Sequence, residues 1–145
     1  SMETTLLVGD HILVNKFIYG IRIPFTSDRW PAFKNPQRGD VIVFIFPEDR
    51  TKDFIKRVVG VAGDTIEVRN KQVYINGKPE HNPHARYADP SIIPAGASRR
   101  DNMPPLKVPP NRLFVMGDNR DYSLDSRFFG PVSADKIIGR VVYKL

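Results

Sequence analysis

The sequence contains no cysteine, which excludes disulfide bonds, thiolate metal sites and a cysteine nucleophile. Histidine is also scarce, with only His11, His81 and His84 along the chain. Pro83 interrupts the pair in "HNPH" and prevents an ordinary helix from presenting both rings on one face. A short histidine pair without neighbouring carboxylates is a weak metal signal, and no histidine stands beside an obvious serine nucleophile for a Ser-His-Asp triad. We therefore expect no metal and no other cofactor.

Long apolar runs are missing as well. No run approaches the ~20 residues that a helix needs to cross a bilayer, and the chain carries no signal peptide. The abrupt start in "SMETTLLVGD" looks like that of a trimmed chain. The sequence is therefore compatible with a membrane anchor in the parent protein.

The composition is that of an ordinary globular domain. The 145 residues are 41% hydrophobic and 26% charged, which predicts one domain, residues 1–145, with a substantial core. The net charge of +6 is compatible with nucleic acid, with an anionic membrane surface, or with neither. The cations are spread along the chain rather than clustered with aromatic residues, and we expect no nucleic-acid partner.

Strand signals recur along the chain, whereas helical periodicity is weak. β-branched and aromatic runs bounded by turn residues predict a mainly β fold, an antiparallel sheet core. Asn70–Lys71 is predicted to turn a hairpin, and Asn76–Gly77 marks a second turn. Only short helices are expected, near residues 123–129 or 133–136. The predicted strands cover residues 11–19, 40–46, 53–62, 65–69, 72–75, 112–117 and 136–145.

Proline is distributed unevenly. Eight of the 13 prolines fall between Pro79 and Pro110, so residues 79–110 are predicted to be irregular and mostly loop. We interpret this Pro-rich segment as a variable insertion within the single domain.

Residues 117–127, "GDNRDYSLDSR", combine three aspartates, two arginines and two serines directly after the apolar strand "LFVM". This density indicates either a buried, mutually paired polar network that holds something in place or a solvated charged loop. The sequence pattern alone leaves both interpretations open.

Lys56 lies inside the β-branched run "DFIKRVVGVA". Strand alternation places it on one face with Phe54 and Val58, and places Arg57 on the opposite face. A lysine on an edge strand is a usual guard against aggregation. A buried lysine, in contrast, has a lowered pKa and can act as a general base toward a serine hydroxyl. If Lys56 is the buried cation, Arg57 is the solvated one.

Four blocks decide between these interpretations. "SMETTLLVGD", "RGDVIVFIFPED", "DFIKRVVGVAGD" and "MGDNRDYSLDSRFFGPV" occur in this order, and together they resemble the bacterial type I signal peptidases. The trailing "IIGRVVYKL" is similar to the closing strand of that family's catalytic core. The resemblance implies a membrane-anchored serine endopeptidase with a Ser-Lys dyad, which removes signal peptides from exported preproteins.

The resemblance also implies roles for individual residues. Ser1 would be the nucleophile, Lys56 the general base, and Ser123 the group that orients the lysine. Shallow apolar pockets would select small residues, in an Ala-x-Ala pattern, at the −1 and −3 positions of the substrate. The supporting polar network would be Asp118, Asp125, Arg120 and Arg127, and the pockets would be lined by Met2, Leu6, Phe54 and Ile55.

Two departures from the family pattern concern the first residues. Thr4 stands where the family usually has proline, which should change backbone stiffness near the nucleophile more than its chemistry. Ser1 is the first residue, whereas the family's oxyanion hole combines the serine backbone N–H with a side-chain donor just upstream. Loss of one such donor costs about 10²–10³ in rate, so we expect the chain by itself to be a weak enzyme. Alternatively, Ser1 is a tag remnant before an initiating Met2.

The resemblance further implies a location. One or more transmembrane helices would precede Ser1, and the domain would lie on the outer face of the bacterial cytoplasmic membrane, against its lipid surface. The candidate membrane flank is residues 17–25 with Trp30, where Arg22 and Arg29 could meet lipid phosphates. Ordinary core packing of these aromatics is the alternative.

Two other functions are compatible with parts of the sequence. A self-cleaving repressor-type protease shares the Ser-Lys chemistry, although "GDNRDYSLDSR" argues against it. A non-enzymatic basic β module that binds nucleic acid or membrane is the third hypothesis.

Overall fold

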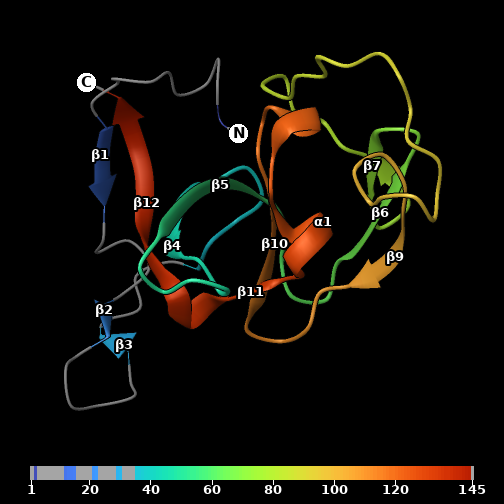
Figure 1. Ribbon diagram of the computed structural model, residues 1–145. Helices are drawn as coiled ribbons and strands as arrows, with labels where there is room; N and C mark the ends of the chain where they lie inside the picture. Colours follow the sequence, from blue (N-terminus) through green and yellow to red (C-terminus); the bar gives the residue numbers. More distant parts are fainter. Residues whose placement is uncertain (1, 3–11, 16–20, 23–28, 31–34, 145) are drawn as a thin grey trace.

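The computed structural model of the chain describes residues 2, 12–15, 21–22, 29–30 and 35–144 (Figure 1). These residues form a six-stranded sheet in the order β1-β12-β4-β5-β10-β11, a four-stranded sheet in the order β8-β7-β6-β9, and the two-stranded pair β2-β3. All strand pairs in these sheets are antiparallel, which confirms the predicted mainly β, antiparallel fold.

Seven strands lie within predicted runs, namely β1, β4, β5, β6, β7, β10 and β12, whereas β2, β3, β8, β9 and β11 were not predicted. In the larger sheet they are β1 Ile12–Asn15, β12 Ile137–Lys144, β4 Val41–Ile45, β5 Asp53–Gly60, β10 Arg112–Met116 and β11 Val132–Ser133. In the smaller sheets they are β8 Lys78–Pro79, β7 Gln72–Ile75, β6 Thr65–Arg69, β9 Met103–Lys107, β2 Ile21–Arg22 and β3 Arg29–Trp30. The helices are the single turns η1 Arg120–Tyr122, α1 Ser126–Phe129 and η2 Ala134–Lys136.

The β6–β7 hairpin turns where the sequence predicts. Asn70 and Lys71 have φ angles of 46° and 75°, the left-handed conformation that a two-residue turn needs to match the twist of its strands. Asn76 and Gly77 then reverse the chain into β8 with φ angles of 52° and 81°.

The central strands β5 and β10 are buried on both faces. On β5, Val58 packs into one apolar cluster with Ile42 and Phe44, and its neighbour Val59 packs into a second cluster with residues of β6 and β7. Figure 1 shows β10 with α1 beside it, and β6, β7 and β9 beyond them on one side. From Lys56 to Gly60, β5 therefore carries buried side chains on both faces, whereas Asp53 at its start is exposed.

The Pro-rich segment, residues 79–110, is mostly irregular but contains β9, a strand that the proline content concealed. β9 includes Pro104 and Pro105, and among the described strands it pairs with β6 alone, at the edge of the sheet. Proline cannot donate a ladder hydrogen bond, so it is tolerated on such an edge strand. The segment therefore completes the four-stranded sheet before the chain enters β10.

Candidate active site

Lys56 lies in the middle of β5, opposite Ile42 of β4, and only 4% of the residue is exposed. Its Nζ donates a hydrogen bond of 3.0 Å to the Oγ of Ser123 and lies 5.5 Å from the centre of the Phe54 ring. Burial lowers the pKa of Lys56 to about 8, although the Asp125 carboxylate counteracts part of this decrease. The desolvated lysine is thus poised to exchange a proton near neutral pH.

Ser123 follows η1 in an extended conformation, φ −127° and ψ 126°, and is 7% exposed. Its Oγ accepts a hydrogen bond of 3.1 Å from the backbone N–H of Gly117, just after β10. One lone pair of the hydroxyl oxygen is therefore fixed by backbone. The other side of the oxygen faces the lysine, so the serine is oriented before any ligand binds.

Asp125 begins the helix α1 and shares the same backbone donor. Its carboxylate caps the helix by accepting from the N–H of Arg127 at 3.1 Å, and it accepts from Gly117 N–H, also at 3.1 Å. The Arg127 side chain closes a bidentate pair with it, through Nε and Nη2, both at 2.9 Å. Asp125 is 0% and Arg127 is 2% exposed, so this pair is fully desolvated and satisfied.

Asp118, also 0% exposed, is paired with Arg57 rather than with an arginine of its own loop. Arg57 donates from Nε and Nη2 to the two carboxylate oxygens, each at 2.9 Å, and from Nη1 to the carbonyl of Gly39 at 2.8 Å. Only 12% of the Arg57 side chain is exposed. The prediction that Arg57 is the solvated cation of β5 was therefore wrong: both cations are held inside, one on each face.

Arg120 has a partner that the sequence analysis missed. Its guanidinium, in a residue 1% exposed, forms a bidentate pair with Glu80 at 2.7 and 2.9 Å and donates from Nε to the carbonyl of Gly117 at 2.9 Å. Glu80 stands forty residues away in the Pro-rich segment, and no local spacing could have indicated the contact.

Residues 117–127 thus form a buried paired network, and the interpretation as a solvated loop was wrong. The four charged side chains expected to support the site all belong to this network. They form three separate pairs: Asp118 with Arg57, Asp125 with Arg127, and Arg120 with Glu80. The three pairs surround the backbone of Gly117 and Asp118.

The whole chain, residues 1–145, matches the family described as signal peptidase, peptidase S26. The chain belongs to this family. Signal peptidase I of Pseudomonas fluorescens is 40% identical over 97% of this chain and 57% of the relative, and signal peptidase I V of Bacillus subtilis is 36% identical over 96% of this chain and 77% of the relative. A crystal structure of a signal peptidase I from Enterococcus faecalis matches 74% of this chain and 97% of that chain, with 31% identity and a TM-score of 0.57.

This S26 chain spans little more than half the length of its Pseudomonas relatives, 57% in each of two cases. Among the residues that the structure describes, no helix is long and apolar enough to span a membrane. Of the predicted membrane flank, only the backbone of β2 and β3 is described, and these two short strands pair with each other. The rest of residues 17–25 lies outside the described part of the chain.

The predicted substrate pockets of this S26 chain are described in part. Met2 is 5% exposed, and its Sδ accepts from the N–H of Asp118 at 3.4 Å, beside the candidate site. Phe54 stacks on Phe46, with ring centres 4.1 Å apart, on the Lys56 face of β5. Ile55 is half-buried opposite Val43. Ser1 and Leu6 lie outside the described residues, so their roles, and the lining of the pockets, stay predictions.

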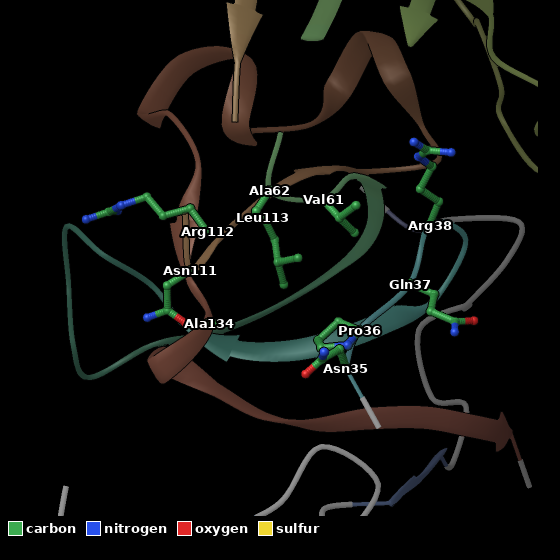
Figure 2. A pocket seen from close by; sticks show the side chains of 10 residues that line it. All are labelled: Asn35, Pro36, Gln37, Arg38, Val61, Ala62, Asn111, Arg112, Leu113 and Ala134. Atoms are coloured by element: carbon green, nitrogen blue, oxygen red, sulfur yellow. The ribbon is translucent and has the colours of Figure 1, made fainter. Parts of the chain in front are cut away.

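A separate cavity of about 780 Å³ opens beside β10 (Figure 2). Figure 2 shows the side chains of Val61 and Leu113 at this cavity, with Arg38 and Arg112 extending toward its margins. Among the described residues that line it, neither Lys56 nor Ser123 is present. Its lining residues are Asn35, Pro36, Gln37, Arg38, Val61, Ala62, Asn111, Arg112, Leu113 and Ala134.

Proposed function

We propose that this chain is the catalytic domain of a serine endopeptidase that removes signal peptides from exported preproteins, with Ser1 as nucleophile and Lys56 as general base. The observation that carries the proposal is the environment of Lys56: it is buried, its pKa is lowered to about 8, and its Nζ is held 3.0 Å from a serine hydroxyl. Membership of the peptidase S26 family and the similarity to signal peptidases I of other bacteria support the same activity.

The proposed reaction proceeds through a covalent acyl-enzyme. The neutral amine of Lys56 removes the proton of the Ser1 hydroxyl while Oγ attacks the scissile carbonyl. The resulting ammonium returns this proton to the leaving amine, and the C–N bond breaks. A water molecule then attacks the ester carbonyl while Lys56 accepts a proton from it. The C–O bond to Ser1 breaks, the Lys56 ammonium returns the proton to the Ser1 Oγ, and the acyl group leaves as the free carboxylic acid. No metal or other cofactor is needed for these steps.

In this proposal Ser123 orients the lysine rather than attacking the substrate. Its oxygen accepts from Gly117 N–H on one side and from Lys56 Nζ on the other. The amine therefore uses an N–H toward Ser123, which leaves its lone pair available for the nucleophile. Asp125 keeps the shared Gly117 donor in place.

We also propose that Met2, Leu6, Phe54 and Ile55 form the shallow pockets for alanine at −1 and −3, and that the domain works against a lipid surface on the outer face of the cytoplasmic membrane. The Pro-rich segment, residues 79–110, would be a short form of a variable insertion within one catalytic domain. An extended substrate would pair with an exposed strand edge and gain affinity from main-chain hydrogen bonds.

The test uses the full-length protein in detergent micelles and a peptide with alanine at −1 and −3. Cleavage should occur after the −1 alanine and should be lost in Ser1→Ala and in Lys56→Ala. A second peptide with phenylalanine at −1 should resist cleavage, because a filled pocket excludes a larger side chain. Cleavage that survives either alanine substitution would contradict the proposed dyad.

A further inference from the structure

Glu80 and Arg120 form a buried, bidentate ion pair between the Pro-rich segment and residues 117–127. The Arg120 residue is 1% exposed and the Glu80 side chain 9%, and the pair is bidentate with distances of 2.7 and 2.9 Å. The Tyr87 hydroxyl accepts a further, longer bond of 3.4 Å from the same guanidinium. A bidentate carboxylate fixes both the position and the plane of a guanidinium.

Glu80 is itself fixed by the four-stranded sheet. It follows β8 directly, and its backbone N–H donates to the carbonyl of Val73 on β7 at 2.8 Å. The carboxylate is therefore attached to a rigid element rather than to a free loop. Through this anchor, the position of Arg120 is determined by the β7–β8 ribbon.

Arg120 in turn fixes the backbone beside the candidate catalytic pair. Its Nε donates to the carbonyl of Gly117 at 2.9 Å, while the N–H of Gly117 is the donor that Ser123 and Asp125 share. The two peptide groups that flank the Gly117 Cα are thus both held. Glycine has no Cβ to restrict its dihedral angles, so these external bonds set its conformation.

We infer that Glu80 is a positioning residue for the Lys56–Ser123 pair, acting through Arg120 and the Gly117 backbone. This inference rests on the proposed function of Lys56 and Ser123, and it assigns the start of the Pro-rich segment to the support of the site. Arg86, further along the Pro-rich segment, attaches the segment to residues 117–127 a second time. The N–H of Arg86 donates to Asp118 O at 2.7 Å, and its carbonyl accepts from Arg120 N–H at 3.0 Å.

The consequence of losing the Glu80 contact is specific. Without the bidentate carboxylate, the guanidinium can leave the Gly117 carbonyl, and the peptide between Gly117 and Asp118 can rotate. The dihedral angles of Gly117 then change, and the Gly117 N–H, which belongs to the preceding peptide, no longer holds the Ser123 oxygen in place. Water then gains access to Lys56, and the burial that lowers the lysine pKa is reduced. Both the rate of the chemical step and the titration of Lys56 should change, whereas the proposed pocket residues Phe54 and Ile55 stay held on β5 by its pairing with β4.

The experiment compares two variants of the full-length protein with a matched control. Glu80→Asp keeps the charge but retracts the carboxylate by one methylene, so Arg120 must move away from Gly117 to remain paired. The double variant Glu80→Leu/Arg120→Met replaces the pair by apolar side chains, a change that commonly preserves stability, and removes the Gly117 bond without altering net charge. Glu48→Asp makes the same chemical change as the first variant at an exposed position.

Three measurements are made: the steady-state kinetics of the alanine peptide, which give kcat and KM; the thermal unfolding midpoint; and the titration of Lys56, followed through its ¹³Cε resonance. We expect kcat to fall by about tenfold to hundredfold in both variants, as for a misplaced catalytic group, with KM changed far less. We expect the Lys56 midpoint to rise toward the ordinary lysine value. The control should match the wild type in all three quantities.

A purely structural role predicts a different pattern. In that case the double variant, if it folds with the unfolding midpoint of the wild type, would also show the kcat and the Lys56 titration midpoint of the wild type. This result would overturn the inference. If the double variant does not fold, an unchanged kcat and titration in Glu80→Asp overturn it equally. Because the titration needs no catalysis, failure of this inference is distinct from failure of the proposed dyad, which is read from Lys56→Ala.

Discussion

The guanidinium of Arg57 holds the buried carboxylate of Asp118 with two hydrogen bonds of 2.9 Å, which join the middle of β5 to the first residues after β10. Arg57 also donates to the Gly39 carbonyl just before β4. One side chain thus connects three segments that surround Lys56. Lys56, the neighbour of Arg57 on β5, faces the opposite side. The strand therefore contributes a structural cation, Arg57, to one face and a candidate catalytic cation, Lys56, to the other.

Removal of Arg57 should therefore destabilise the fold strongly. Arg57→Met keeps the apolar stem but leaves the carboxylate of Asp118, 0% exposed, without its guanidinium, which typically costs about 3–5 kcal/mol. Urea unfolding measures the change. As a control, Lys52→Met breaks an exposed ion pair with Asp49, 3.9 Å long, and should cause no measurable loss. Equal stability of the two variants would contradict the buried role of Arg57.

Asp64 should contribute stability that is lost only in strong acid. Arg38, which donates to both of its oxygens at 2.8 and 2.6 Å, lowers the pKa of Asp64 to about 2. A depressed carboxyl pKa stabilises the fold above the unfolded value of about 3.9, and this contribution disappears as the pH falls through about 2. Because half of the Arg38 side chain is exposed, we expect a contribution on the order of 1 kcal/mol.

The measurement is the unfolding midpoint of wild type and Arg38→Gln between pH 6 and pH 2. The two curves should be separated at pH 6 and converge toward pH 2. A constant separation over the whole range would show that the arginine acts by packing rather than through the Asp64 charge.

Lys56 should cost the protein stability at neutral pH. Its pKa is about 8 when folded and about 10.4 when unfolded, so below pH 8 both states carry the proton and the full penalty of burying the charge is present. Between about pH 8 and 10.4 the folded state binds fewer protons, and the stability rises with pH.

Lys56→Met should therefore raise the free energy of unfolding at pH 7, by on the order of 1–3 kcal/mol after the lost bond to Ser123 is deducted. The advantage of the variant should shrink as the pH rises toward 10. Denaturant unfolding at pH 7 and pH 10 checks both statements, and a destabilised variant at pH 7 would refute the assignment of a desolvated lysine.

Local signals predicted most of the fold. The β6–β7 hairpin follows from Asn70–Lys71 and the alternation of its strands, which involve neighbours in the chain. β9 was not predicted, because it contains two prolines and because it forms only by pairing with β6, which is far away in the sequence. Strand propensity describes a residue's own preference, while pairing at a sheet edge is a tertiary property.

In the candidate site, too, the features that depend on residues distant in the sequence could not be predicted from local patterns. Burial of Lys56 follows from the position of β5 between β4 and β10, which no pattern within the strand could establish. The contact of Lys56 with Ser123 spans sixty-seven residues and was expected only from the resemblance to a family. Arg57 and Glu80 were missed because their partners are distant. Pairing "DFIKR" with "LFVMGD" as adjacent strands would have placed Arg57 beside Asp118, since Met116 lies opposite Arg57.

The role of Lys56 as a neutral base can be measured through the pH dependence of kcat/KM in the full-length protein. Because the base works only without its proton, the rate should rise with pH to a plateau, with a midpoint near the lysine pKa of about 8. A rate that continues to rise to a midpoint near the free-lysine value of about 10.4, or that is unchanged through this range, would contradict the account.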